Sequence, residues 1–376
     1  MPTAESSALL GGLTAAAFLR RHWQKRALLV RGAVPGFTGS VTRDALFALA
    51  GRDDVDSRIV LRERNRWTTF EGPLRKSLQK SLPARGWTLL VHGVNLHVPA
   101  ADALLRRFAF IPYARLDDLM VSYAAPGGGV GPHFDSYDVF LLQGQGRRRW
   151  RISRQRDLGL KPGMPLKILA RFRPTTAWTL APGDMLYLPP DHAHDGVAVD
   201  ACTTYSIGFW APSAQELGTA FLDWLRDGLS LDGRYADPHL RPTREPARID
   251  AAMRSACAAM LRAIRWDGAA VARFVGSYLS EPKPQVTFTR PDAALPLRAF
   301  ARAAGMRGVS LNPCAQILYD DRNVYVNGIA LAWPDGAAEQ IMNLANARRL
   351  RGADCNGVVL AGVLHDWYCD GYLTLD

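Results

Sequence analysis

The chain has 376 residues, of which 48% are hydrophobic and 22% are charged, a composition typical of a globular protein long enough for two or three domains. Its formal net charge of +11 favours contact with polyanions such as RNA, although a solvated basic surface explains the charge equally well. No run approaches the roughly 18 apolar residues that cross a bilayer, and the basic residues of the N-terminus follow its apolar stretch instead of preceding it. These features argue against a membrane protein and a secretory signal, and they predict a cytoplasmic protein with a folded N-terminus.

The region from Ala27 to Trp210 alternates short apolar runs with glycine and proline breaks, as in RALLVRGAVPG, DDLMVSYAAPGGG and CTTYSIGFWAP. Runs this short, rich in Val, Leu, Tyr and Phe, are typical of strands, and many of them at close spacing indicate a sandwich or a small barrel. A helix is predicted before them near Ala15–Trp23 with Thr14 as its N-cap, and another near Ala100–Phe108. Residues 1–212 are therefore predicted to form the first domain.

The pattern changes after Pro212, where Ser213 is a candidate N-cap for the helical run AQELGTAFLDWLRDGL. Two more helical runs follow, ARIDAAMRSACAAMLRAIRW and GAAVARFVGSYLS, so a helical domain is predicted over residues 213–280. Its simplest role is packing against the barrel. The prolines of EPKPQV then indicate a linker.

The last part of the chain, residues 281–376, has a mixed pattern. QILYDDRNVYVNG predicts a hairpin with Asp-Asp-Arg-Asn at its turn. Two helical runs, AAEQIMNLANARRL and VVLAGVLHDWYCDG, and the strand-like YLTLD follow. A hairpin and helices in so short a segment favour a winged helix.

The sequence PGGGVGPHFDSYDVFLLQG carries the strongest functional signal, a histidine and an aspartate two residues apart. On a strand, residues i and i+2 point to the same face, so His133 and Asp135 can converge on one metal ion while Phe134 points into packing. An isolated pair of this kind is more often a surface pair than a metal site. The glycine-rich approach favours the metal site, because glycines are entropically costly unless the backbone needs unusual angles or close approach.

A third ligand is expected from DMLYLPPDHAHDG, where two histidines follow a turn and a Pro-Pro pair. Two histidines and one carboxylate form a facial triad, which leaves three positions free on an octahedral ion and suits non-haem iron(II) oxygenases. Two free positions accept a bidentate keto acid, and the third accepts O2. Zinc fits the same ligand types, but nothing nearby indicates the glutamate base of a hydrolase. On an extended chain His192 and His194 share a face, so strand geometry leaves the choice between them open.

A keto diacid also needs a cation for its far carboxylate, and GQGRRRWRIS supplies candidates. By strand alternation, Arg148 shares the face of Trp150 and Ile152, whose apolar side chains predict that this face points inward. Arg148 is then the buried cation that can pair bidentately with a carboxylate, although a protein carboxylate is an alternative partner. The outward arginines are expected to form a solvated or RNA-facing stripe. Ser122, on the strand before the glycine run, is a candidate hydrogen-bond donor to the same cosubstrate.

These segments resemble a known family. PGGGVGPHFDSYDVFLLQGQGRRRWRIS, LAPGDMLYLPPDHAHDG and TTYSIGFWAP are similar to the bacterial ribosomal oxygenases of the JmjC class, and so is the N-terminal FLRRHWQKRALLVRGAVPGF. The similarity is dense from about residue 18 to 225 and weakest in the last hundred residues. Within this family it is greatest to the arginine hydroxylases that act on large-subunit ribosomal protein L-sixteen.

The resemblance implies an α+β protein with a double-stranded β-helix (cupin/JmjC) core, a helical dimerisation region and a C-terminal winged-helix-like domain. It places iron(II) on His133, Asp135 and His194, with 2-oxoglutarate on Arg148 and Ser122. With O2 as oxidant, the implied reaction is hydroxylation of the β-carbon of an arginine in the ribosomal protein. The partners that the resemblance implies are that protein and a second copy of the chain, and the basic charge adds contact with ribosomal RNA as an expectation.

A substrate arginine needs carboxylates or aromatic faces near the metal, and Asp117, Asp118, Tyr123 and Tyr137 are candidates by their closeness in sequence. Two other classes of function remain open. A metal-binding cupin of another class, such as an isomerase or a thiol dioxygenase, has no need of a buried arginine. A winged-helix nucleic-acid-binding regulator accords with the basic charge, but the last domain shows no obvious basic recognition helix.

Overall fold

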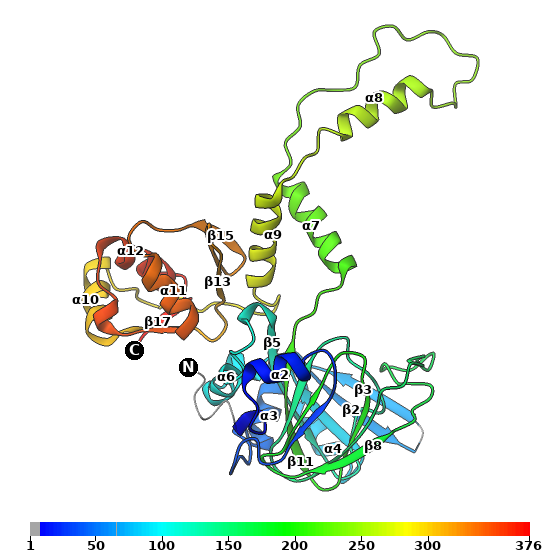
Figure 1. The fold of residues 1–376 in the computed structure, drawn as a ribbon, viewed down its shortest axis with the longest axis vertical. Coiled ribbons are helices and arrows are strands. Elements are labelled where there is room, and N and C mark those ends of the chain that lie inside the picture. The colour runs from blue at the N-terminus through cyan, green and yellow to red at the C-terminus, as the bar shows by residue number, and fades with distance from the viewer. Residues whose placement is uncertain (1–7, 65) are drawn as a thin grey trace. The chain divides into compact units, whose positions relative to one another are not determined.

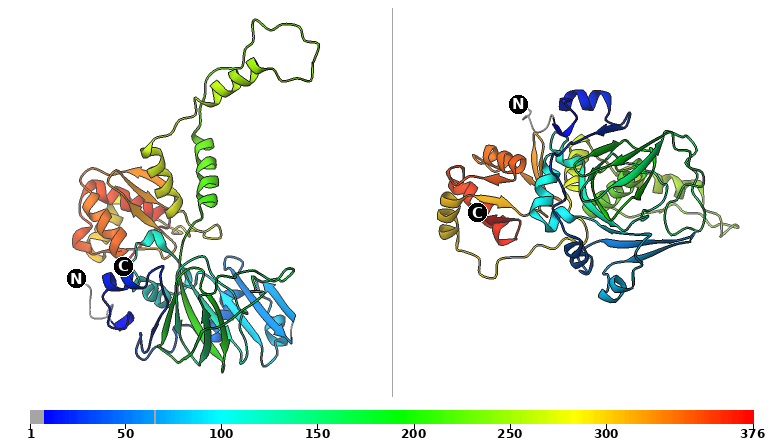
Figure 2. Two further views of the ribbon diagram at one scale, coloured as in Figure 1. Left: turned by 45° about the vertical axis from the view of Figure 1, so that its right-hand side comes forward. Right: turned by 90° about the horizontal axis from the view of Figure 1, so that it is seen from below.

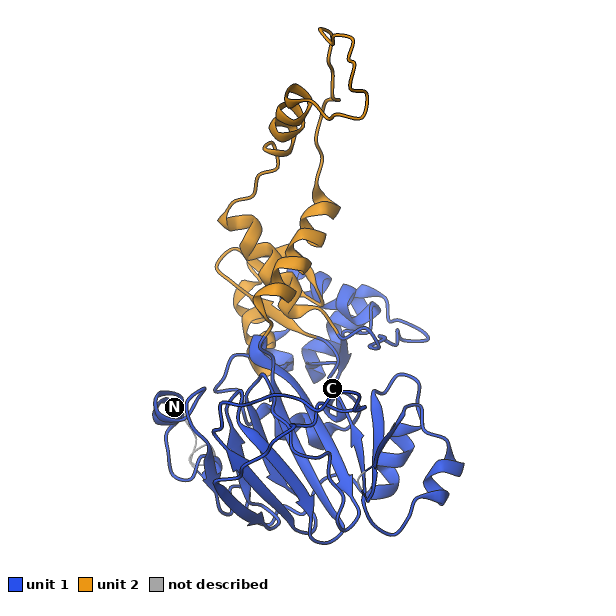
Figure 3. Cartoon of the chain, turned by 90° about the vertical axis from the view of Figure 1, so that its right-hand side faces the viewer, with its two compact units in different colours: residues 1–211, 283–315, 348–376 blue, residues 212–282, 316–347 orange. Residues whose placement is uncertain are grey.

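The computed structural model describes residues 8–64 and 66–376, so the prediction of a folded N-terminus lies outside the described residues as far as residues 1–7 are concerned. The chain divides into two compact units (Figure 3). Unit 1 consists of Met1–Ala211, Lys283–Ala315 and Arg348–Asp376, and unit 2 consists of Pro212–Pro282 and Gln316–Ala347. The division into three domains at residues 212 and 280 remains a prediction. Within the described residues, no helix is both long and apolar enough to cross a membrane.

Unit 1 contains a large antiparallel sheet with the strand order β1-β9-β6-β11-β5-β4-β2-β3. Its members are β1 (Leu28–Val30), β2 (Ser57–Glu63), β3 (Arg66–Glu71), β4 (Trp87–Val91), β5 (Leu116–Ala124), β6 (Val139–Gln143), β9 (Met185–Leu188) and β11 (Cys202–Phe209). A second antiparallel sheet has the order β10-β7-β8 and consists of β7 (Arg148–Ser153), β8 (Thr176–Leu180) and β10 (Ala193–Ala198). The strand-rich prediction for this region is confirmed.

The two sheets face each other across one apolar cluster. Strands β6 and β9 of the large sheet contribute Leu141 and Leu186, and strands β7 and β8 of the small sheet contribute Trp150, Ile152 and Leu180. Because side chains of both sheets fill the same space, the sheets enclose an interior in the manner of a small barrel (Figure 1). This interior is where inward-pointing polar residues can be held away from water.

A larger apolar core covers the other face of the large sheet, where helices pack against it (Figure 2). Phe18, Leu46 and Leu104 from three helices join Val121 and Tyr205 of the sheet in this core. The helices of this part are α2 (Ala15–Arg21), α3 (Arg43–Ala50), α4 (Lys76–Ser81), α5 (Val94–His97) and α6 (Pro99–Arg106), with the short 3-10 helix η1 (Tyr113–Arg115). The predicted helices near residues 15–23 and 100–108 are therefore confirmed.

Unit 1 also includes most of the chain's C-terminal segments. Helices α10 (Leu297–Arg307) and α12 (Val358–Cys369) pack beside a small sheet of order β16-β12-β17. Its strands are β12 (Val309–Leu311), β16 (Arg349–Leu350) and β17 (Leu373–Leu375), and η2 (Gly352–Asp354) is a 3-10 helix.

Unit 2 contains α7 (Ala214–Gly228), α8 (Ala251–Leu261), α9 (Gly268–Ser280), the sheet of β13 (Ile317–Tyr319), β14 (Asn323–Val326) and β15 (Ile329–Ala332), and α11 (Ala338–Ala347). Local signals explain these boundaries. The Ser213 hydroxyl and the Glu216 carboxylate form a capping box at the start of α7. Strands β13 and β14 pair as an antiparallel hairpin around residues 320–322, as predicted.

Helices α7 and α8 contain no buried residue. Large apolar side chains around them are exposed to solvent, among them Leu222 (62%), Ile249 (64%) and Leu261 (65%). Figures 1 and 2 both show α8 and the connection before it extending away from α7 and α9. So many exposed apolar side chains are unusual for a surface that only meets water.

Candidate active site

Three side chains predicted to bind metal lie together in unit 1. One ligand atom from each of His133, Asp135 and His194 lies within 4.8 Å of the other two. The Nε2 atom of His194 is 3.6 Å from a carboxylate oxygen of Asp135. In the described part of the chain, no other three histidine, cysteine or acidic side chains come together in this way. Since His194 is buried and the other two are half-buried, the cluster is accessible from one side.

The expectation that His133 and Asp135 lie on a strand is wrong. His133 makes only an isolated bridge, to His194, and Asp135 lies in a loop. A continuous ladder is blocked before this point because Pro132 lacks an N–H group, and Gly131 has a φ of 81°, outside the range of strands. The side chains still converge because the bridge holds His133 beside β10, which carries His194.

The backbone also selects which nitrogen of each imidazole faces the cluster. Nδ1 of His133 is 2.8 Å from the carbonyl oxygen of Gly131, and Nδ1 of His194 is 2.8 Å from that of His192. A nitrogen beside a carbonyl oxygen carries the proton, so each Nε2 is left with a free lone pair. Burial, together with the nearby His133, lowers the pKa of His194 to about 4, so this imidazole is neutral at pH 7. Neutral imidazole is the form that binds metals.

His192 was the competing candidate for the third ligand. It is buried, but it lies outside the cluster, and its Nδ1 atom is 3.3 Å from the carbonyl oxygen of Pro190. The structure therefore places His194, the histidine that the family resemblance implies, beside His133 and Asp135.

The glycine-rich approach allows the backbone before the cluster to pass very close to its neighbours. A side chain on Gly129 would place its Cβ 2.5 Å from the carbonyl oxygen of Gly196, and one on Gly128 would place it 2.2 Å from that of Trp87. A larger residue at Gly129 would push the segment that leads to His133 away from β10, and one at Gly128 would push it away from β4.

Arg148 points into the interior, as strand alternation predicts. Cross-strand pairs place Arg148 opposite Ala198 and Ile152 opposite His194, and paired residues share a face. Arg148 is only 5% exposed, and its Nε and Nη2 atoms have no hydrogen-bond partner in the described part of the chain. The alternative, a pair with a protein carboxylate, is not seen among the described residues. A buried guanidinium without an anion is costly, so this site fits the carboxylate of a bound keto diacid.

Side chains next to Arg148 line the same interior of the barrel. The guanidinium carbon of Arg148 is 5.6 Å from the centre of the Trp150 ring. Gly196 makes room for that ring, because a Cβ there would lie 2.6 Å from it. Arg149 points outward and is exposed.

Ser122 is buried in the large sheet, in a polar row that crosses three strands. Cross-strand pairs join Ser122 to Thr204 and Thr204 to Gln143. The Ser122 hydroxyl donates weakly to the Thr204 carbonyl oxygen at 3.5 Å, and the Thr204 hydroxyl donates to Oε1 of Gln143 at 3.3 Å. Sequence reasoning missed Gln143, since a lone glutamine at a strand end carries no local signal.

The four candidates for holding a substrate arginine have different surroundings in the structure. Tyr123 packs against Trp87, on the helix-covered face of the large sheet. Asp118 is buried. Asp118 and Tyr137 both lie beside Gly208, since each would be within about 4 Å of a side chain placed there. Asp117 is partly exposed.

Asp118 belongs to a charged group that the sequence did not reveal. Its carboxylate accepts a hydrogen bond from the Gly93 N–H at 2.8 Å and lies 3.5 Å from Nδ1 of His92 and 3.6 Å from Nζ of Lys283. Burial alone would raise the pKa of Asp118, but His92 and Lys283 outweigh it and lower that pKa to about 2. Asp118 is therefore ionised at neutral pH.

The chain is similar to two family models and to known proteins. A family model described as a JmjC domain matches residues 103–217, and one described as a ROXA-like winged helix matches residues 263–374. The ribosomal protein uL16 3-hydroxylase of Escherichia coli strain K12 is 41% identical over 236 residues, which are 62% of each chain. A probable ribosomal oxygenase of Haemophilus influenzae is 37% identical over 61% of this chain and 55% of its own. The match thus spans less than two thirds of the length of these two relatives.

Solved structures match over nearly the whole chain. An X-ray structure of E. coli ycfD has a TM-score of 0.83 and 30% identity, and the match covers 97% of this chain and 98% of that one. A structure of the E. coli ribosomal oxygenase YcfD with cobalt and 2-oxoglutarate has a TM-score of 0.82 and 29% identity, with the same coverage. The predicted cupin/JmjC fold and the C-terminal winged helix are confirmed. The dimerisation role of residues 213–280 remains a prediction.

Proposed function

Since the chain belongs to the JmjC-domain family of E. coli YcfD, we propose that it is an iron(II)- and 2-oxoglutarate-dependent dioxygenase that hydroxylates a ribosomal protein. The observation that carries this proposal is the cluster of His133, Asp135 and His194 on the edge of an interior that also contains the unpaired guanidinium of Arg148. Two imidazoles and one carboxylate are the donor set of non-haem iron(II) oxygenases.

Bound iron(II) and 2-oxoglutarate would supply the activation of O2 and the oxidation of a C–H bond to an alcohol, with succinate and CO2 as co-products. The chain's own residues bind, orient and exclude water. His133 and His194 offer Nε2 lone pairs, and Asp135 offers a negative charge. Arg148 pairs with the far carboxylate of 2-oxoglutarate, and Ser122 adds a hydroxyl to it. The apolar interior around Trp150 keeps bulk water away from the reacting groups.

The proposed substrate is an arginine of the large-subunit ribosomal protein L-sixteen, oxidised at its β-carbon. The E. coli relative, which is named a ribosomal protein uL16 3-hydroxylase, supports this choice. Asp118 provides an ionised carboxylate for a guanidinium, and Tyr137 provides an aromatic ring beside it. Tyr123 packs on the other face of the sheet, so it is not part of the proposed contact with the substrate arginine.

A second copy of the chain is the proposed occupant of the apolar surface of α7 and α8, whose exposed leucines and isoleucine need a cover. A protein that modifies ribosomal proteins in bacteria works in the cytoplasm, so we place this chain there. Contact with ribosomal RNA is also part of the proposal.

The test is to incubate the protein with iron(II), 2-oxoglutarate and ribosomes from its host and to analyse the ribosomal proteins by mass spectrometry. We expect a mass increase of one oxygen atom on the L-sixteen protein, and no increase with the Asp135→Ala variant. The Asp292→Ala variant, which removes an exposed carboxylate elsewhere in unit 1, should behave as the unaltered protein does. Undiminished succinate formation by Asp135→Ala would rule out the proposed ligand set. Iron(II) binding that 2-oxoglutarate leaves spectroscopically unchanged would indicate a cupin enzyme of another class.

A further inference from the structure

The positive charge of the chain is concentrated in one segment of unit 1. Residues 147–173 contain ten basic residues and one acidic residue, so nine of the chain's eleven net positive charges lie in this short stretch. Arg148 is the buried member, and the other nine are at least partly exposed. We call residues 154–173, which connect β7 to β8, the basic loop. A charge this concentrated is a binding surface for a polyanion rather than a general solubility device.

Few of these cations are neutralised within the protein. Arg147 pairs with Asp200 and Arg151 with Asp195, and Arg171 lies 3.9 Å from Asp157. The remaining exposed cations make no ion pair with a carboxylate of the described residues, namely Arg149, Arg154, Arg156, Lys161, Lys167 and Arg173. Their charge is therefore available to a partner.

The basic loop is built to hold its arginines together. The Gln155 side chain donates to the carbonyl oxygen of Arg171 at 2.8 Å and accepts from the N–H of Arg173 at 2.9 Å, which ties the start of the loop to its end. Gln155, Arg156, Asp157, Arg171 and Arg173 line a hollow of about 290 Å³. Guanidinium groups in such a hollow match the oxygens of a phosphate, which they can bind in pairs.

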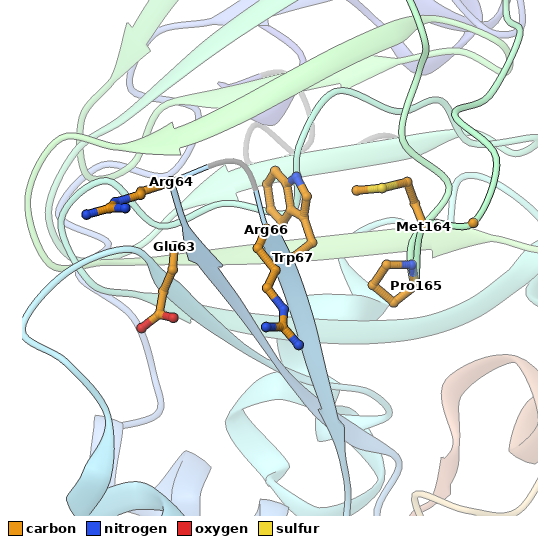
Figure 4. Close-up of a pocket in the computed structure, with 7 residues that line it drawn as sticks. Glu63, Arg64, Arg66, Trp67, Met164 and Pro165 are labelled. Carbon is orange, nitrogen blue, oxygen red and sulfur yellow. The ribbon is translucent and has the colours of Figure 1, made fainter.

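A second hollow, of about 950 Å³, adjoins the middle of the basic loop and contains an aromatic ring (Figure 4). Its lining consists of Glu63, Arg64, Arg66, Trp67, Gly163, Met164 and Pro165. Figure 4 shows Met164 reaching toward the indole of Trp67. A half-exposed tryptophan beside arginines provides a surface on which a nucleobase can stack.

The basic loop is also connected to the proposed metal site. The N–H of Leu169 donates to the carbonyl oxygen of Pro132 at 2.8 Å, directly before His133. Trp67 lies against Gly131, since a Cβ there would be 3.0 Å from its ring. A nucleic acid bound here would therefore lie beside the proposed catalytic centre.

We propose that the basic loop and the Trp67 hollow form a binding site for single-stranded RNA, with phosphates on the arginines and an unstacked base on Trp67. This rests on the proposed function, because a ribosomal protein substrate is a protein that associates with RNA. Arginine outnumbers lysine among the exposed cations, which favours phosphate, and the aromatic ring favours a nucleobase over an acidic peptide or a membrane surface.

The test uses the metal-free full chain and a fluorescein-labelled, unstructured 12-nucleotide RNA, with binding followed by fluorescence anisotropy at several salt concentrations. The variant Arg154→Gln/Arg156→Gln/Arg173→Gln should bind at least about tenfold more weakly, and its slope of log affinity against log salt should fall by about 2, at about 0.7 per phosphate contact. The matched control, Arg75→Gln/Arg298→Gln/Arg302→Gln, removes the same charge from other exposed sites of unit 1 and should bind within about twofold of the unaltered chain.

Trp67→Ala should weaken binding about tenfold without changing the salt slope, and Trp67→Phe should restore most of the affinity, because a ring stacks whether or not it carries a charge. The proposal is overturned if the RNA does not bind, or if both triple variants weaken it equally. It is also overturned if polyglutamate or phosphatidylserine vesicles bind more tightly than RNA at the same sites. Because no iron or 2-oxoglutarate is present, failure here leaves the oxygenase proposal standing, and failure of the oxygenase assay leaves RNA binding measurable.

Discussion

His133 and His194 are hydrogen-bonded to each other through their backbones in both directions. The N–H of His133 donates to the carbonyl oxygen of His194 at 2.9 Å, and the N–H of His194 donates to that of His133 at 2.8 Å. Their ring centres are 4.2 Å apart. Two residues 61 positions apart in the chain are thus held together by one isolated antiparallel bridge. The spacing of two proposed metal ligands therefore depends on a backbone contact and needs little adjustment when metal binds.

This pairing predicts which histidine matters for metal binding. His194→Ala should lower the affinity for Co(II), used as an oxygen-stable substitute for iron(II), by at least about 100-fold, whereas His192→Ala should change it by less than about tenfold. His192 is the natural control because it is buried two residues away but lies outside the cluster. Calorimetric titration of both variants measures the difference. Equal losses in the two variants would show that the cluster does not select His194.

A buried cation without an anion predicts an unusual pair of effects at Arg148. Arg148→Met should raise the KM for 2-oxoglutarate by about 10- to 100-fold, because a charge-assisted pair is lost. The same change should stabilise the ligand-free protein by about 1–3 kcal/mol in urea unfolding, since it removes an uncompensated buried charge. Arg149→Met, on the exposed side of the same strand, should show neither effect. A destabilised Arg148→Met protein would indicate that the guanidinium has a structural partner.

Local patterns predicted the parts of the site that depend on one segment. The inward direction of Arg148 follows from alternation with Trp150, and the start of α7 follows from Ser213, because strand faces and helix caps are set within a few residues. The choice between His192 and His194 needed more. It depends on the register of β10 against the segment of His133, a long-range pairing that no short pattern encodes.

The same limit explains the other misses. Lys283 reaches Asp118 from 165 positions away in the chain, so proximity in sequence could suggest Asp118 but could not reveal its partners. No strand forms at His133 because Pro132 and Gly131 interrupt the ladder. The glycine-rich run predicts unusual backbone angles or close approach, but it does not say that the strand stops before His133.

The exposed apolar surface of unit 2 predicts a dimer. Leu222→Glu on α7 should convert the dimer to a monomer, because a charge would be buried at the contact. Met306→Glu is the matched control, since Met306 is 72% exposed in unit 1, away from α7 in the sequence. Light scattering coupled to size-exclusion chromatography gives the molar mass of each variant. A monomeric mass for the unaltered chain would contradict the prediction.

The group around Asp118 predicts a stability that depends on pH. Because its pKa is lowered to about 2 in the folded chain, below the usual 3.8, its ionised form stabilises the fold above pH 4, and this stabilisation is lost as the pH falls toward 2. Burial lowers the pKa of His92, but its hydrogen bond to Asp118 and the negative charge of Asp118 outweigh burial and raise that pKa. The stabilisation that charged His92 provides is therefore present below pH 6.5 and is lost as the pH rises above it.

Asp118→Asn should therefore lower the free energy of unfolding by about 2 kcal/mol at pH 5.5, and by less at pH 3. Asp117→Asn, at the partly exposed end of the same Lys283 contact, should cost less than about 1 kcal/mol. Urea unfolding of the three proteins at both pH values decides the matter: if the loss in Asp118→Asn is the same at pH 3 as at pH 5.5, the carboxylate is not what stabilises this group.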